Sequence, residues 1–68
     1  MEKNWVLVYS AGDIFHAELL KARLSDEGIV CDIINKKDSS FAFGDVEVYV
    51  YSTDEEKARA IIHEFEAN

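Results

Sequence analysis

Residues 46–51 of this chain read Val-Glu-Val-Tyr-Val-Tyr, and this stretch decides the fold. Its valines alternate strictly with glutamate or tyrosine, which is typical of a strand with one buried face. We predict a strand over residues 45–51 whose valines lie on the side of the helices. Glu47, Tyr49 and Tyr51 are then expected on the opposite side of the sheet.

Two more strands are predicted before this one. Residues 5–9 read Trp-Val-Leu-Val-Tyr, and residues 29–34 read Ile-Val-Cys-Asp-Ile-Ile. Both stretches are rich in β-branched and aromatic residues and are bounded by polar residues or glycine, as strands usually are. The chain therefore contains three predicted strands.

A first helix is predicted from Asp13 to Glu27, between the first two strands. Ser10 or Asp13 can cap its start, and Gly28 can end it. At 100° per residue this helix carries two apolar stripes. One stripe is expected in the core, and the other packs inside the monomer or contacts a second subunit. The first stripe is Ala17, Leu20 and Leu24, with Ile14 at its margin, and the second is Phe15, Leu19 and Ala22.

A second helix is predicted after the third strand and ends at about Phe65. Ser52 with Glu55, or Thr53 with Glu56, has the spacing of a capping box at its start. This helix has a single apolar stripe, which we expect in the core. The stripe consists of Ala58, Ile61, Ile62 and Phe65.

The order strand-helix-strand-strand-helix predicts an α+β fold in a single domain spanning residues 1–68. Strands joined through a helix should be parallel with a right-handed crossover, and the third strand should lie between the first two. Both helices then cover one face of a three-stranded sheet. This arrangement is a ferredoxin-like plait without its last strand.

The predicted topology leaves two surfaces of the sheet without a partner. The strand over 5–9 lies at an edge, where its backbone groups are a template for another strand. One face of the sheet has no helix over it, and either Trp5, Leu7 and Tyr9 or Val6 and Val8 lie on that face. We expect self-association through the open face or this edge. The candidate contact residues are Trp5, Tyr9, Tyr49, Tyr51, Phe15 and Leu19.

The chain is acidic, with 7 Lys+Arg against 14 Asp+Glu and a net charge of −7. Nucleic acids and anionic membranes are bound by clusters of basic residues, so we expect neither as a partner. The first residues lack the apolar run of a signal peptide, and no apolar run is long enough for a membrane helix. The single cysteine, Cys31, fits a buried side chain in a reducing compartment. We expect a cytoplasmic protein.

No set of side chains has the spacing of a catalytic or metal site. His16 follows Asp13 by three residues and His63 precedes Glu66 by three, but each pair offers only two ligands, and we interpret both as solvated surface. The serines have no histidine or aspartate at a recognisable spacing, and the three glycines form no phosphate-binding loop. We therefore expect no enzymatic activity, no metal and no cofactor.

Residues 35–44 form a longer connection than a hairpin requires, and they contain two phenylalanines among polar residues. Phe41 and Phe43 either fold back over the sheet or the core, extend the third strand, or form an aromatic loop that contacts another protein. The last alternative makes Phe41, Phe43, Lys36 and Lys37 a candidate partner-binding loop.

Several short segments of the chain resemble one known family. They are Val8-Tyr9-Ser10, residues 17–21 through Leu24, Glu27-Gly28-Ile29, and residues 46–50 followed by Asp54-Glu55 and Ala58. Together they resemble the small bacterial domains grouped as prokaryotic signal-transducing proteins, a family of unknown function. Its members are described as similar in fold to nitrogen-regulatory PII proteins, which are ferredoxin-like trimers. The resemblance implies that residues 35–44 occupy the place of the partner-binding loop of PII proteins, in shortened form. The phosphate-binding glycines and basic residues of PII proteins have no match in the chain.

The sequence thus favours a non-enzymatic regulatory or protein-interaction module. We expect a homo-oligomer, a dimer or a trimer, that contacts an unidentified protein partner through the loop. The alternative hypothesis is a sensor of a small metabolite that binds between subunits.

Overall fold

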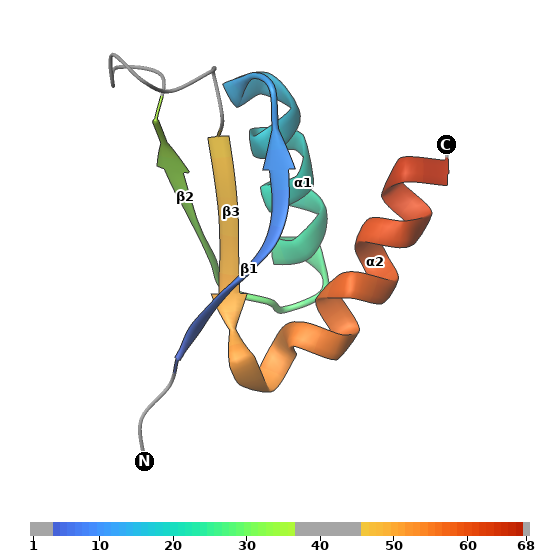
Figure 1. Cartoon of the computed structure of the whole chain (residues 1–68). Coiled ribbons are helices and arrows are strands. Elements are labelled where there is room, and N and C mark those ends of the chain that lie inside the picture. Colours follow the sequence, from blue (N-terminus) through green and yellow to red (C-terminus); the bar gives the residue numbers. More distant parts are fainter. Residues whose placement is uncertain (1–3, 37–45, 68) are drawn as a thin grey trace.

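The computed structural model describes residues 4–36 and 46–67 of the chain. The elements follow the predicted order, as Figure 1 shows. They are β1 (Trp5–Ala11), α1 (Ile14–Asp26), β2 (Cys31–Asn35), β3 (Val46–Tyr51), a short 3-10 helix η1 (Ser52–Asp54) and α2 (Glu55–Ala67).

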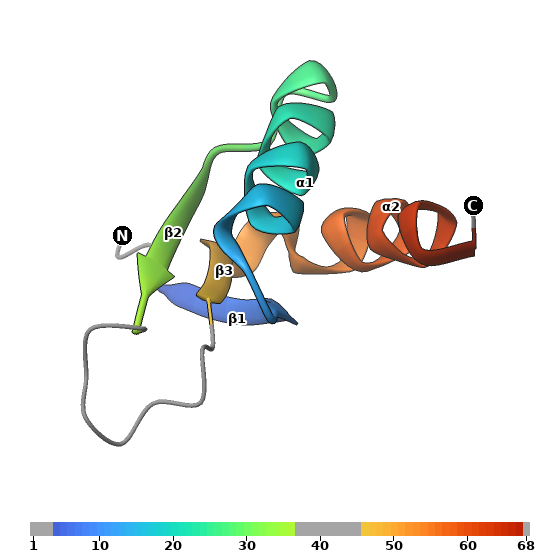
Figure 2. The same cartoon turned by 90° about the horizontal axis from the view of Figure 1, so that it is seen from above.

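The strand β3 is the centre of the sheet. The strand order is β1-β3-β2, and β3 is antiparallel to both neighbours. Both helices lie on the same side of the sheet (Figure 2). The predicted α+β class and the place of the third strand between the first two are therefore confirmed, whereas the assignment to the ferredoxin-like plait stays a prediction.

The core lies between the sheet and the two helices. The three valines of β3 are fully buried, and they pack in one cluster with apolar residues of α1 and α2. This confirms the predicted faces of β3 and the predicted core stripes of both helices. The helix residues of the cluster are Ala17, Leu20 and Leu24 from α1 and Ala58, Ile61 and Ile62 from α2, with Phe65 partly buried against them.

Both ends of α1 follow from single residues. Asp13 is its N-cap, since its side chain accepts a hydrogen bond of 2.9 Å from the backbone N–H of His16. The other predicted cap, Ser10, lies inside β1. At the end of the helix, Gly28 has a φ of +81°, and a Cβ there would meet nothing within 4 Å. The backbone conformation, and not close packing, therefore requires glycine at this position.

The start of α2 differs from the prediction. Instead of a capping box, the short helix η1 precedes α2, and its N-cap residue, Tyr51, makes no capping bond with its side chain. The backbone N–H of Ser52 donates to the carbonyl of Asn4 at 2.7 Å. One of the N–H groups that a cap would satisfy is thus bonded to the chain just before β1.

The strand β1 contains a bulge that the sequence did not predict. Its register with β3 shifts between Leu7 and Tyr9, so that Val8 is the additional residue. Before the shift, Trp5 and Leu7 lie on the open face of the sheet, opposite Tyr51 and Tyr49. After it, Tyr9 is opposite the buried Val48 and packs against the core. Of the two predicted alternatives, the one with Trp5, Leu7 and Tyr9 on the open face holds for Trp5 and Leu7. It is wrong for Tyr9, because the bulge turns this residue to the side of the helices.

Candidate functional site

The face of the sheet away from the helices is the main candidate for a functional surface. We call it the open sheet face. The alternation of the strands assigns its members, because paired residues point to the same side. They are Trp5, Leu7 and Ser10 from β1, Asp32 and Ile34 from β2, and Glu47, Tyr49 and Tyr51 from β3.

Trp5 and Tyr51 form an aromatic pair on this face. Their ring centroids are 4.4 Å apart and the ring planes are inclined by 28°, so the rings are stacked. Such a pair contributes about 0.5–1.5 kcal/mol beyond the burial of its area. Trp5 nevertheless stays 44% exposed. We call this stack of Trp5 and Tyr51 the aromatic ridge of the open sheet face, and part of its surface is accessible.

A polar group lies next to the aromatic ridge. The hydroxyl of Tyr49 donates a hydrogen bond of 2.7 Å to Oε1 of Glu47, and Nζ of Lys36 lies 3.2 Å from the same oxygen. The hydrogen bond from Tyr49, followed by that from Lys36, lowers the pKa of the Glu47 carboxyl. The same carboxylate raises the pKa of the Tyr49 hydroxyl. Glu47 is thus held as an anion between two donors.

The edge of β1 is partly occupied by α2. Nη2 of Arg59 donates a hydrogen bond of 3.3 Å to the carbonyl of Leu7, which lies at the bulge. Nε of the same residue donates to Glu55 at 3.0 Å. Among the described strands β1 pairs only with β3, so it is an edge strand as predicted. One of its acceptors, however, is already bonded within the monomer.

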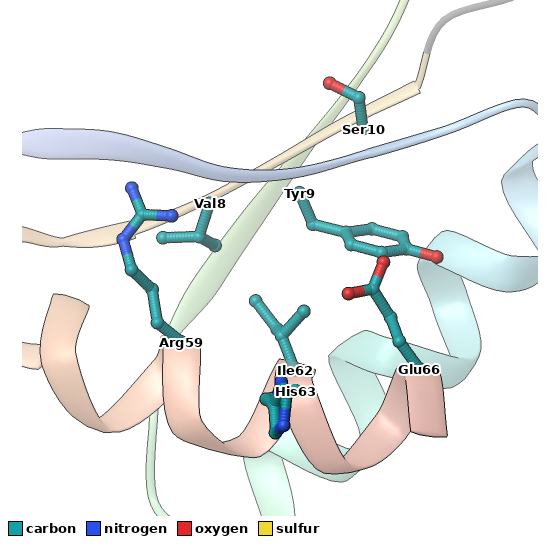
Figure 3. A pocket seen from close by; sticks show the side chains of 7 residues that line it. All are labelled: Val8, Tyr9, Ser10, Arg59, Ile62, His63 and Glu66. Carbon is teal, nitrogen blue, oxygen red and sulfur yellow. The ribbon is translucent and has the colours of Figure 1, made fainter. Parts of the chain in front are cut away.

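An open pocket of about 360 Å³ lies between β1 and α2 (Figure 3). The side chains of Arg59 and Glu66 reach from α2 toward β1, whereas Ser10 points away from α2. The guanidinium of Arg59 already donates hydrogen bonds to the carboxylate of Glu55 and to the backbone carbonyl of Leu7. Glu66 adds a negative charge to the pocket lining. The pocket is therefore polar, but its charge does not select anions. Its full lining is Val8, Tyr9, Ser10, Arg59, Ile62, His63 and Glu66.

The second apolar stripe of α1 faces outward. Phe15 is 64% exposed, and Leu19 is also exposed. Leu19 lines a second open pocket, of about 470 Å³, together with Tyr9 and Phe65. The rings of Tyr9 and Phe65 meet edge to face at a centroid distance of 6.1 Å. Of the two alternatives for this stripe, packing inside the monomer does not hold for Phe15, and a contact with a second subunit stays a prediction.

The histidine and cysteine residues considered as catalytic or metal-binding candidates do not form a common site in the part of the chain that the structure describes. His16 pairs with its own helix cap, since its Nδ1 lies 3.0 Å from Oδ2 of Asp13. Cys31 is half-buried, and burial raises the pKa of its thiol. In the described part of the chain, no three residues among His, Cys, Asp and Glu come together as metal ligands.

The predicted partner-binding loop is described only at its beginning. Lys36 pairs with Glu47, as given above. The other three residues, Lys37, Phe41 and Phe43, lie outside the described residues. Their role stays a prediction.

Two exposed apolar residues of the β2 region were not among the predicted contact residues. Val30 is 56% exposed and Ile34 is 41% exposed. A continuous apolar run such as residues 29–34 does not reveal which side chains are covered, because both of its faces read alike. With the third strand predicted in the middle of the sheet, the strand of residues 29–34 lies at the second edge. This edge position was the only indication in the sequence that Val30 and Ile34 are exposed.

Comparisons with known proteins assign the chain to a family. Neither described helix has the length and apolar character that crossing a membrane requires. No curated protein and no solved structure matches the chain. Residues 5–66 match a protein family described as "Putative prokaryotic signal transducing protein". This match covers nearly all of the 68 residues, so the chain belongs to this family.

Proposed function

We propose that the protein is a non-enzymatic interaction module of a signalling system and that it binds another protein chain through the open sheet face. The first partner that we propose is a second copy of the chain. The family description names signal transduction and no catalytic activity. The only cysteine of the chain, Cys31, is free, which fits a reducing compartment such as the cytoplasm.

The observation that carries the proposal is the aromatic ridge on a sheet face that no described helix covers. Trp5 and Leu7 are exposed there beside the half-buried Tyr49 and Tyr51. Tryptophan and tyrosine are enriched among the residues that dominate protein interfaces. A chain of this length buries only about 60% of the surface that its unfolded form exposes, so association is a common source of additional stability. These features support self-association through the ridge.

Two further surfaces belong to the proposal as secondary contacts. The exposed stripe of α1, with Phe15 and Leu19, is an alternative surface for a second copy. The connection between β2 and β3, with Phe41 and Phe43, is the proposed contact for a different protein partner. Its support is the sequence alone, since aromatic residues are favoured as interface anchors.

The experiment is to measure the molar mass in solution by light scattering over a range of concentrations. We expect the wild type to form a dimer or a trimer. Trp5→Ser should raise the dissociation constant about tenfold or more, as expected for the loss of a central aromatic contact. Phe15→Ser is the matched control, because it removes an even more exposed aromatic side chain from α1. If only Phe15→Ser raised the dissociation constant, the interface would lie on α1 and not on the aromatic ridge. A wild type that is monomeric at all concentrations would contradict the proposed self-association.

The alternative function is a sensor of a small metabolite, and the pocket between β1 and α2 favours it. The pocket combines the guanidinium of Arg59, the imidazole of His63 and the carboxylate of Glu66 in about 360 Å³. A ligand that binds only the folded state raises the midpoint of thermal unfolding. A panel of metabolites in a thermal-shift assay, repeated with His63→Ala, would therefore separate a sensor from an interaction module.

A further inference from the structure

Among residues 4–36 and 46–67, fewer contacts cover the outer edge of β2 than the outer edge of β1. In the order β1-β3-β2 each outer strand has one edge without a neighbouring described strand. At β1, Arg59 bonds the carbonyl of Leu7. No described element lies beside the outer edge of β2 in either view (Figures 1 and 2). Its outward N–H and C=O groups are therefore a template for another strand.

The side chains at this edge favour strand pairing and burial. β2 has five residues, Cys31–Asn35, and it is preceded by the exposed Val30. Ile34 is also exposed. Valine and isoleucine are enriched in strands because they pack well on a pleated surface. A partner strand at this edge would remove part of the Ile34 side chain from water.

The charges along the edge are arranged so that the strand complements itself. Asp32 and Ile34 lie on the open sheet face, opposite Tyr49 and Glu47. Lys36 reaches the same face, since its Nζ is 3.2 Å from Glu47. When two copies of β2 pair antiparallel about Ile34, this residue faces itself, and Asp32 of each copy faces Lys36 of the other. Opposite charges across two strands stabilise the pairing, and like charges destabilise it.

A different register loses this match. In a pairing centred on Ile33, Asp32 of one copy faces Ile34 of the other, and Cys31 faces Asn35. The two carboxylates then have no cation opposite them. The charges therefore favour the register centred on Ile34.

We propose that two copies of the chain pair edge to edge through β2, about a two-fold axis at Ile34, and form one six-stranded sheet in the order β1-β3-β2-β2-β3-β1. This surface is distinct from the aromatic ridge, and the proposal does not depend on the proposed use of the ridge. The pairing joins the open sheet faces of the two copies into one continuous surface. Since the paired strands are short, the contact belongs to the small and weak interfaces, and the dimer should dissociate on dilution.

A charge exchange between two variants tests the register. Asp32→Lys places lysine opposite Lys36 at both ends of the pairing, and Lys36→Asp places two aspartates opposite each other. We expect each variant alone to have a dissociation constant at least tenfold higher than that of the wild type. A mixture of the two should form a heterodimer with a dissociation constant well below that of either variant alone, because every facing pair is again of opposite charge. Such recovery would also show that both variants are folded.

A cysteine placed at the two-fold axis gives an independent test. In a Cys31→Ser background, Ile34→Cys places two thiols at the axis, where strand residues are about 4.5–5.5 Å apart between Cα atoms and a disulfide fits. We expect rapid disulfide-linked dimers on mild oxidation. Val30→Cys is the matched control, since Val30 is more exposed than Ile34 but far from its own copy in this register.

Three results would overturn the proposal. They are a wild type that stays monomeric at high concentration, a dimer that neither charge variant weakens, and equal cross-linking of the two cysteine variants. The test distinguishes this proposal from self-association through the aromatic ridge. A dimer that is insensitive to Trp5→Ser but shows the charge exchange supports pairing through β2 and contradicts self-association through the ridge.

Discussion

Nη2 of Arg59 donates a hydrogen bond of 3.3 Å to the backbone carbonyl of Leu7. The bond joins the middle of α2 to the bulged edge of β1, and it occupies an acceptor that another strand could use. Native proteins commonly protect edge strands with bulges and with charged side chains. β1 has both, whereas the described register of β2 with β3 contains no bulge.

Removal of this contact should expose the edge of β1. Arg59→Gln shortens the side chain and breaks the bonds to Leu7 and Glu55. Because Arg59 is half exposed, we expect the free energy of unfolding to fall by only about 0.5–1 kcal/mol. Association measured by light scattering should increase.

Arg23→Gln is the control for the Arg59 variant. Arg23 pairs with Glu64 at 3.2 Å, so its loss removes a similar exposed ion pair away from the strand edge. Urea unfolding should give a similar small loss for both variants. Increased association of Arg23→Gln to the same extent would contradict a protective role of Arg59.

Gly28 should be intolerant of a side chain for a conformational reason. Its φ of +81° lies in the left-handed region, where an L-residue costs about 1–2 kcal/mol. Gly28→Ala should therefore lower the free energy of unfolding by about this amount. Gly12→Ala is the control, because Gly28 alone has a positive φ among the described glycines. Equal losses for the two variants in urea unfolding would show that backbone conformation is not the cause.

The residues whose environment is predictable from sequence are those with an unambiguous local pattern. β3 alternates valine with polar or aromatic residues, so its faces follow from period two alone. Asp13 and Gly28 lie where a cap and a left-handed residue are needed, which are local requirements. In β1, by contrast, residues 5–9 are apolar on both faces, and a bulge depends on packing against β3 and α2. The position of Tyr9 and the bond from Arg59 to Leu7 could therefore not be derived from the sequence.

Two adjacent leucines of α1 should differ sharply in their importance for stability. Leu20 is fully buried in the core, whereas Leu19 is exposed. Leu20→Ala should cost about 2–5 kcal/mol, because it removes buried methyl groups and leaves a cavity. A small domain rarely has a total stability of more than about 3–5 kcal/mol, so circular dichroism should show a much lower midpoint of unfolding for this variant.

Leu19→Ala makes the same chemical change at an exposed position of the helix. Exposed substitutions usually change stability by no more than about 0.5 kcal/mol, so it should unfold like the wild type. If Leu19→Ala were strongly destabilising in the dimer but not at high dilution, Leu19 would be part of an interface between copies.

The carboxyl of Glu47 should make stability depend on acidic pH. Hydrogen bonds from Tyr49 and Lys36 lower its pKa in the folded state below the ordinary value of 4.5. The stabilisation is therefore complete above this value and is lost as the pH falls through the lower pKa of the folded state. Chemical unfolding at several pH values between neutral and strongly acidic should show wild type losing its advantage over Glu47→Gln. Glu18→Gln, at an exposed position on α1, controls for the loss of one negative charge from an acidic chain. A constant difference between wild type and Glu47→Gln over the whole range would contradict the role of the two donors.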